Sequence, residues 1–149
     1  MLCSTGALAD ARISRGRVRV TSAVKHFKFQ PLGKRRIHQK PNAGEVKACR
    51  WWLDRELVAI GPAVAVALGA TAAQSLAGRP VPIMKNRGPT EFGRSGLAHQ
   101  AGFVTVHPSS LLRLPDHEQR AKAYDAFVAD LRRVRRMLEA GKRATNKAA

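Results

Sequence analysis

The spacing of apolar residues along the chain predicts three strands. Strand-like segments stand at residues 18–24, 63–68 and 103–106, and the second of them is apolar at every position. A continuous apolar run of this length is typical of a strand that is covered on both faces. The chain is therefore expected to build its core around a buried sheet.

A spacing of three and four residues predicts helices between and after these strands. In residues 45–60 the apolar side chains form one stripe, at Val46, Cys49, Leu53, Leu57 and Ile60. Asn42 and Glu45 match a capping box at the start of this helix, and Gly61-Pro62 ends it. A short helix is predicted at residues 72–76, closed by Gly78, and a long one at residues 116–139.

The alternation of strands and helices indicates an α/β protein with three layers, α/β/α, around a short parallel sheet. In such sheets functional groups gather on the loops at the carboxyl ends of the strands. Those loops are residues 25–42, 69–71 and 107–109 here. Residues 79–100 are rich in Gly and Pro and predict a long loop, with Arg87 as a contact point. One domain is expected over residues 1–140, followed by a disordered basic tail over residues 141–149.

Charge points to a polyanionic partner. Lys and Arg number 27 against 10 Asp and Glu, a net charge of +17, and residues 12–50 hold twelve of the cations and one acid, Glu45. A compact domain with this field attracts phosphate backbones, with an affinity that falls as salt rises. No basic amphipathic helix with a broad apolar face, signal peptide or long apolar run argues for membrane binding. With only two cysteines, Cys3 and Cys49, the chain is expected in the reducing cytoplasm. It is also expected to be a monomer.

The densest cationic segment ends in a histidine. Lys34, Arg35 and Arg36 precede Ile37 and His38, in what the pattern predicts to be a loop. Adjacent cations repel one another, so such a cluster is favourable where a polyanion lies against it. A histidine at its edge can be a nucleophile or proton carrier near neutral pH. The alternative is a solvated loop.

Several motifs, taken in order, resemble one family. The segments are 20–29 (Val-Thr-Ser-Ala-Val-Lys-His-Phe-Lys-Phe), the basic histidine segment, 40–53, 67–73 (Ala-Leu-Gly-Ala-Thr-Ala-Ala) and 104–113 with its His-Pro-Ser. Together they resemble the UdgX branch of family 4 uracil-DNA glycosylases, over residues 7–138. The combination of the basic histidine segment with His-Pro-Ser is specific, whereas either alone is weak.

The resemblance implies excision of uracil from DNA through a flipped nucleotide. By position His107 would stabilise the leaving uracil oxygen, and Pro108 and Ser109 would grip a phosphate. His38 would attack the sugar carbon and leave a covalent adduct, while Lys34, Arg35 and Arg36 hold the backbone.

Each of these roles has a structural alternative. His107 could cap a strand end, and His38 could be a solvated loop histidine. Leu111 would be the wedge that fills the vacated base stack, but it and Leu112 are equally natural as core residues. Trp51 and Trp52 lie within a predicted helix, which favours packing over base stacking.

The sequence also departs from the family pattern. No Gly-Glu-x-Pro-Gly loop precedes Ala7, and residues 1–10 predict the helix that follows the family's first strand, so that strand is expected to be missing. Ser22 stands where the family has an asparagine that reads the uracil edge, and a hydroxyl cannot offer the paired donor and acceptor of an amide. The family's 4Fe–4S cluster needs about four ligands. Here only Cys49 remains, together with His26 at a position where relatives can place another ligand. The cluster is therefore expected to be absent or incomplete.

Three hypotheses follow. The chain is a uracil-DNA glycosylase with His38 and His107 at its site. Alternatively, it is a truncated, inactive fragment that binds DNA non-specifically through its basic surface. In the third, it does not fold alone, because removal of an interior strand leaves ladder groups unsatisfied at ~1–3 kcal/mol each.

Overall fold

A three-stranded sheet forms the centre of the molecule. The computed structural model describes residues 2–26, 28–94 and 97–147. Strands β3 (Ala65–Leu68), β5 (Leu97–Thr105) and β4 (Gly88–Arg94) lie side by side in that order. β3 and β5 are parallel and β4 is antiparallel to β5. The α/β class is thus confirmed, and the sheet is mixed rather than wholly parallel.

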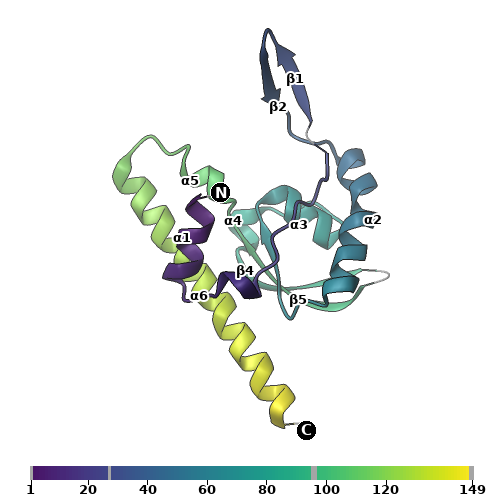
Figure 1. The fold of residues 1–149 in the computed structure, drawn as a ribbon, viewed down its shortest axis with the longest axis vertical. Helices are drawn as coiled ribbons and strands as arrows, with labels where there is room; N and C mark the ends of the chain where they lie inside the picture. The colour runs from purple at the N-terminus through teal and green to yellow at the C-terminus, as the bar shows by residue number, and fades with distance from the viewer. Residues whose placement is uncertain (1, 27, 95–96, 148–149) are drawn as a thin grey trace.

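Helices cover both faces of this sheet (Figure 1). One layer contains α2 (Ala43–Ile60) and α3 (Ala70–Ala77), and the other contains α1 (Leu2–Asp10) and α6 (His117–Lys147). The short elements are η1 (Arg15–Arg17), α4 (Ile83–Asn86) and α5 (Pro108–Leu111). The predicted three layers are confirmed.

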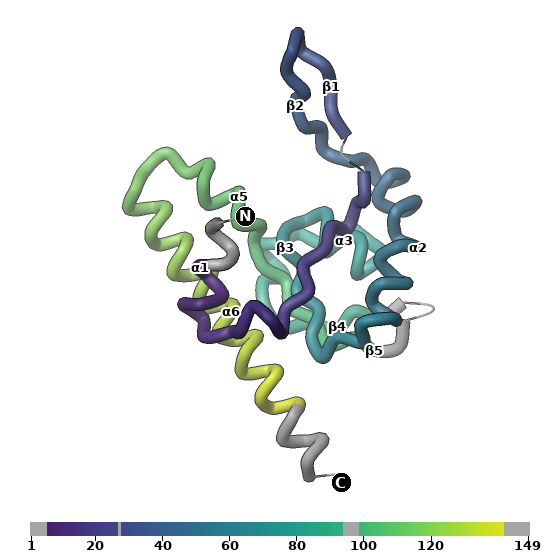
Figure 2. The backbone as a smooth tube through the Cα atoms, viewed as in Figure 1, coloured from purple at the N-terminus to yellow at the C-terminus, as the bar shows by residue number. Residues whose placement is uncertain are grey.

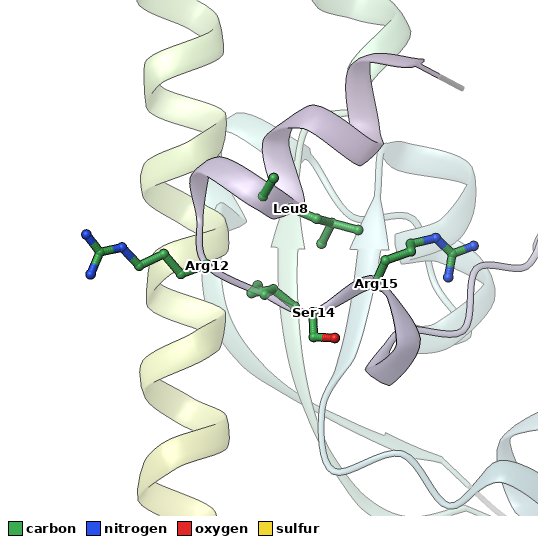
Figure 3. A pocket seen from close by; sticks show the side chains of 6 residues that line it. Leu8, Arg12, Ser14 and Arg15 are labelled. Atoms are coloured by element: carbon green, nitrogen blue, oxygen red, sulfur yellow. The ribbon is translucent and has the colours of Figure 1, made fainter.

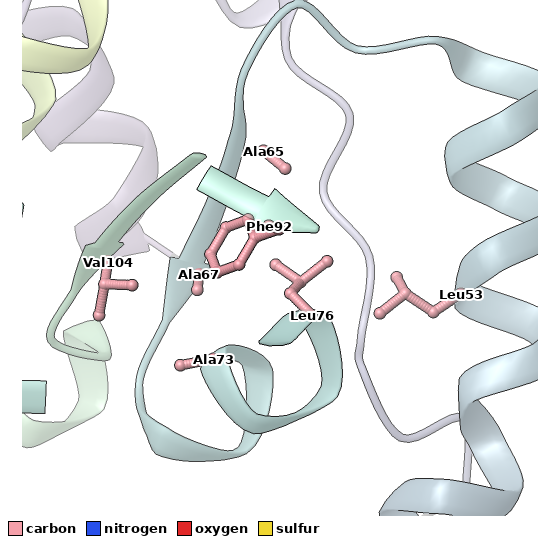
Figure 4. Packing of buried hydrophobic residues seen from close by; sticks show 7 residues of the cluster. All are labelled: Leu53, Ala65, Ala67, Ala73, Leu76, Phe92 and Val104. Atoms are coloured by element: carbon pink, nitrogen blue, oxygen red, sulfur yellow. The ribbon is translucent and has the colours of Figure 1, made fainter. Parts of the chain in front are cut away.

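Two apolar clusters, one on each face of the sheet, hold the layers together. The cluster under α2 and α3 is made of Leu53, Ala65, Ala67, Ala73, Leu76, Phe92 and Val104 (Figure 4). The cluster under α1 and α6 is made of Ala7, Ala11, Leu111, Phe127, Val128 and Leu131. Burial of both clusters supplies the main stabilising free energy of the fold.

Helix α2 begins and ends as its sequence predicts. The Asn42 side chain accepts a hydrogen bond from the Glu45 N–H (2.9 Å), and the Glu45 carboxylate accepts one from the Asn42 N–H (2.8 Å). Gly61 adopts the left-handed conformation that ends the helix. Val46, Cys49 and Leu53 are buried, which confirms the first part of the predicted stripe, whereas Leu57 is half-buried and Ile60 is exposed.

The predicted strand at residues 18–24 is wrong, because this segment has no strand structure. A strand needs a neighbour for its backbone hydrogen bonds. Instead the segment is tied to α2 by side chains: Lys25 Nζ lies 2.7 Å from Glu56 Oε2, which also accepts a hydrogen bond from Thr21 (2.8 Å). Within the described sheet β3 is an edge strand, paired on one side by β5.

The predicted basic loop is also wrong in its structure. β1 (Phe29–Leu32) and β2 (Arg35–His38) pair as an antiparallel hairpin with Phe29 opposite His38. All eight residues of the two strands are exposed. Because no face of the hairpin is buried, its sequence lacks the alternation of apolar and polar residues that predicts a strand.

Residues 79–100 are not the predicted long loop. They contain α4, β4 and the first part of β5. Of β4's apolar side chains, Phe92 is buried, and its ring covers Gly102 of β5 so closely that a Cβ there would collide with it. One buried side chain in a seven-residue strand is too weak a pattern to predict the strand from sequence.

The first and the last described segments are helical. α1 matches the helix expected over residues 1–10, and Arg12, two residues after its end at Asp10, has a left-handed φ of 58°. α6 continues to Lys147, so it includes most of the segment for which a disordered tail is expected, and the order of that segment in solution stays a prediction. Among the described residues no helix has the length and apolar character needed to cross a bilayer.

Candidate active site

The loops after β3 and β5 meet at the carboxyl ends of these parallel strands. Gly69 N–H donates to the Thr105 carbonyl (2.9 Å), which extends the pairing of the two strands by one bond. A Cβ placed on Gly69 would lie 3.0 Å from the His107 Cβ. Gly69 therefore permits the close approach that sets His107 against the start of α3, as the position of the two loops predicts.

His107 is oriented by the residue two positions on. The Ser109 N–H donates to Nδ1 of the imidazole (3.1 Å), and the Ser109 hydroxyl lies 2.7 Å from the same nitrogen. Because Nδ1 accepts, the proton of the neutral ring is on Nε2. Nε2 has no hydrogen-bond partner within the described part of the chain, and it is thus available as a donor.

The environment keeps this ring uncharged. Partial burial lowers the pKa of His107 below its ordinary value, and the positive charge of Arg113 lowers it further. His107 still presents an exposed surface to solvent. Near neutral pH the site therefore offers a neutral N–H donor at the surface.

The second predicted histidine lies on the hairpin. His38 ends β2, and the hairpin projects from the body beyond the amino-terminal end of α2, while α5 lies within the body (Figure 1). Lys34, Arg35 and Arg36 are exposed on this projection, and the Arg36 guanidinium stacks over the Phe29 ring at 4.8 Å. The structure thus sets the cations and His38 together, on a different part of the molecule from His107.

Arg87, predicted to contact DNA, is engaged in an internal ion pair. Its Nε donates to Asp130 Oδ2 (2.6 Å), which also accepts from the Thr105 hydroxyl (2.6 Å). Asp130 is buried, and Arg133 lies 3.7 Å from its other oxygen. This network joins α6 to the sheet, and a role for Arg87 on DNA stays a prediction.

The two leucines after the His-Pro-Ser motif have different environments. Leu111 is buried in the apolar cluster with Phe127, whereas Leu112 is 67% exposed. Leu111 thus serves the core in this structure, the alternative that the sequence leaves open. Leu112 is the leucine whose side chain reaches solvent, a distinction that the repeated leucine in the sequence does not make.

Ser22 and the predicted metal ligands lie in the irregular segment before the hairpin and on α2. Ser22 is exposed in the irregular segment. The Cys49 sulfur lies 3.7 Å from His26 Nδ1, so the structure brings these two predicted ligands together. Within the described residues no third His, Cys, Asp or Glu joins them, and the whole chain has two cysteines. This donor set does not fit a cluster that needs about four ligands.

A hollow of about 370 Å³ lies elsewhere, where α1 gives way to η1 (Figure 3). Leu8, Ala9 and Ile13 give it an apolar lining, and Arg12 and Arg15 stand at its sides. None of the predicted site residues lines it. Its open, apolar character is that of a surface depression, and it does not form part of the candidate site.

The comparison with protein families gives a clear result. A family model described as Uracil DNA glycosylase superfamily matches residues 5–132, most of the chain. The chain belongs to the uracil DNA glycosylase superfamily. A search of curated proteins finds no match. Membership agrees with the α/β/α fold and with the motifs at the carboxyl ends of β3 and β5, and it indicates a glycosylase-like function with DNA as the substrate.

Proposed function

We propose that this superfamily member excises uracil from DNA, with His107 as the group that stabilises the departing base. When the bond between uracil N1 and sugar C1′ breaks, its electron pair leaves with the base and negative charge develops on a uracil oxygen. A neutral imidazole with its proton on Nε2 can donate a hydrogen bond to that oxygen. The observation that carries the proposal is the hydrogen bond from Ser109 N–H to His107 Nδ1 (3.1 Å), because it selects this tautomer.

The expected contribution of this donor is large. A preorganised donor aimed at a developing oxyanion is worth about 10²–10³ in rate when it is removed singly. His107 is held by the Gly69 contact on one side and by Ser109 on the other, so little reorganisation is needed when the charge develops.

At the sugar we propose that His38 supplies the nucleophile. Its imidazole nitrogen bonds to C1′ as the bond to N1 breaks, uracil leaves as an anion that takes a proton from water, and the DNA stays attached to the protein. The exposed hairpin cations would hold the phosphates around the nucleotide. This step requires the hairpin to approach the body when DNA lies between them.

A denaturing gel tests both roles on one uracil-containing oligonucleotide. His107→Ala should slow uracil release about 10²–10³-fold. His38→Ala should abolish any band shifted by a covalent adduct. His99→Ala is the matched control, because His99 is a strongly exposed histidine on β5 that pairs with Glu91. No uracil release and no adduct from the wild-type chain would reject the proposal.

A second candidate function is DNA binding without excision. The observation that favours it is the projection of the His38 hairpin away from the body that carries His107 (Figure 1). This function predicts equal affinity for uracil-containing and thymine-containing DNA, with a steep loss of affinity as salt rises. Preferential retention of uracil-containing DNA at moderate salt would contradict it.

We also propose that the chain acts as a monomer in the cytoplasm and without a complete iron–sulfur cluster. The support for the last point is the two-cysteine composition together with the isolated Cys49–His26 pair. Iron and sulfide analysis of protein purified without oxygen measures it. A stoichiometric content of four irons per chain would contradict this proposal.

A further inference from the structure

Two adjacent tryptophans lie on the outer face of α2. Trp51 is 53% exposed and Trp52 54% exposed, and their rings meet edge to face with centroids 4.7 Å apart. Helical spacing places Trp51 opposite the buried stripe of Val46, Cys49 and Leu53, and Trp52 to one side of it. The packing that the sequence favours over base stacking is thus partial: the rings pack on each other, and about half of each tryptophan stays exposed.

Exposed indoles of this size are unusual on a surface without a partner. A tryptophan buries more area than other side chains when it finds a partner, and contiguous exposed apolar surface marks interaction sites. The two rings support each other but still expose about half of their surface. The exposed surface of the pair therefore consists of flat aromatic faces on a helix.

Cations surround these rings. The Arg55 guanidinium lies 5.3 Å from the centre of the Trp51 ring, and Lys47 is exposed one turn before Trp51. Of the three acids of the helix, Glu45 and Glu56 are paired, with Lys28 and Lys25, and Asp54 is the third. The outer face of α2 therefore presents aromatic rings in a positive field.

The amino-terminal end of α2 leads towards the hairpin (Figures 1 and 2). The β1–β2 hairpin, with its exposed Lys34, Arg35 and Arg36, extends beyond the amino-terminal end of α2 (Figures 1 and 2). Proteins that bind single strands combine a cationic track for the backbone with aromatic rings on which bases stack. A surface that binds another protein would be expected to be apolar and to carry less charge than this one.

We propose that Trp51 and Trp52 form a stacking site for the bases of single-stranded DNA that lies along the hairpin and α2. The inference rests on DNA being the substrate, as in the proposed function, and adds a strand-binding site outside the His107 loop. Stacking accepts any base, so the site would hold a strand without reading its sequence. It would favour unpaired over duplex DNA, whose bases cannot reach the indoles.

Intrinsic fluorescence tests this site directly, because the chain has two tryptophans and both belong to the pair. The full-length chain is titrated with single-stranded oligothymidylate and with an abasic phosphodiester chain of equal length. Oligothymidylate should quench the emission and the abasic chain should not. Trp51→Leu and Trp52→Leu should each weaken oligothymidylate binding, measured by anisotropy of a labelled strand, by roughly 5- to 150-fold. Affinity for the abasic chain and the salt slope should stay unchanged.

Val58→Ala is the matched control, since Val58 is also exposed on α2 but carries no ring. It should leave both affinities unchanged, and circular dichroism melts should show that every variant folds. Equal binding of the two ligands by the wild-type chain would overturn the proposal. So would unaltered oligothymidylate binding in both tryptophan variants, or a change in oligomeric state on their substitution, which would make the pair an interface between copies. Oligothymidylate contains no uracil, so this result is independent of whether the chain excises uracil.

Discussion

Replacement of Gly69 by alanine should disturb both the stability of the fold and the position of His107. Gly69 has φ 84° and ψ 172°, a region that is essentially restricted to glycine and costs about 1–3 kcal/mol for other residues. The added methyl would also lie 3.0 Å from the His107 Cβ. Relief of such overpacking costs about 1–3 kcal/mol. The sum is about 2–6 kcal/mol, a large share of the roughly 5–15 kcal/mol of a typical domain.

Urea unfolding of the two variants Gly69→Ala and Gly61→Ala separates the two effects. Gly61 also has positive φ, 55°, but a Cβ there meets nothing within 4 Å. Gly61→Ala should therefore show a backbone cost alone, about 1–2 kcal/mol. Gly69→Ala should exceed it, and it should also slow uracil release, since His107 must move to make room. A loss of stability no greater than that of Gly61→Ala would refute the claim that Gly69 is needed for the close approach to His107.

Four further predictions concern individual side chains. Arg12→Gly should relieve about 1–2 kcal/mol of left-handed backbone strain and lose about 0.4–1 kcal/mol through the more flexible unfolded chain, so urea unfolding should show a net gain of up to about 1.6 kcal/mol; a loss of stability would contradict this. Asp130→Ala should cost about 3–5 kcal/mol by leaving the half-buried Arg87 charge unpaired, and the double variant with Arg87→Met should recover part of that loss. Asn42→Ala should lower the free energy of unfolding by about 0.5–2 kcal/mol through loss of the α2 cap; an unchanged urea midpoint would argue against a role for the cap. Because the pKa of His107 is lowered in the folded chain, its neutral ring contributes stability above pH ~6.5 that is lost as pH falls below this value, and an NMR titration should give a midpoint below 6.5.

The elements that can be predicted from sequence are those whose signal is local or strongly periodic. The α2 cap at Asn42, its end at Gly61 and the buried stripe between them all follow from rules that span a few residues. β3 was predictable because its apolar run is continuous. The close approach of the Gly69 and His107 loops followed from the topology of parallel strands.

The errors have a common physical cause. Residues 18–24 carry a strand pattern, but a strand exists only when a neighbour accepts its backbone hydrogen bonds, and side-chain bonds to Glu56 hold the segment instead. β4 has one buried aromatic, Phe92, whose ring covers Gly102, ten residues further along the chain on β5. The contact between this ring and Gly102 cannot be predicted from the sequence, because a glycine has no side chain whose type would indicate a buried position.

Sequence by itself determined the family, the positive field, the helix boundaries of α2 and the identity of the histidine after β5. Each depends on residues that are close together in the chain, or on a total over all residues such as the net charge. Tertiary structure decided which of Leu111 and Leu112 faces solvent, that Arg87 is paired with Asp130, and that Trp51 and Trp52 are exposed. These outcomes depend on contacts between residues far apart in the chain, whose free energies exist only once the layers have packed.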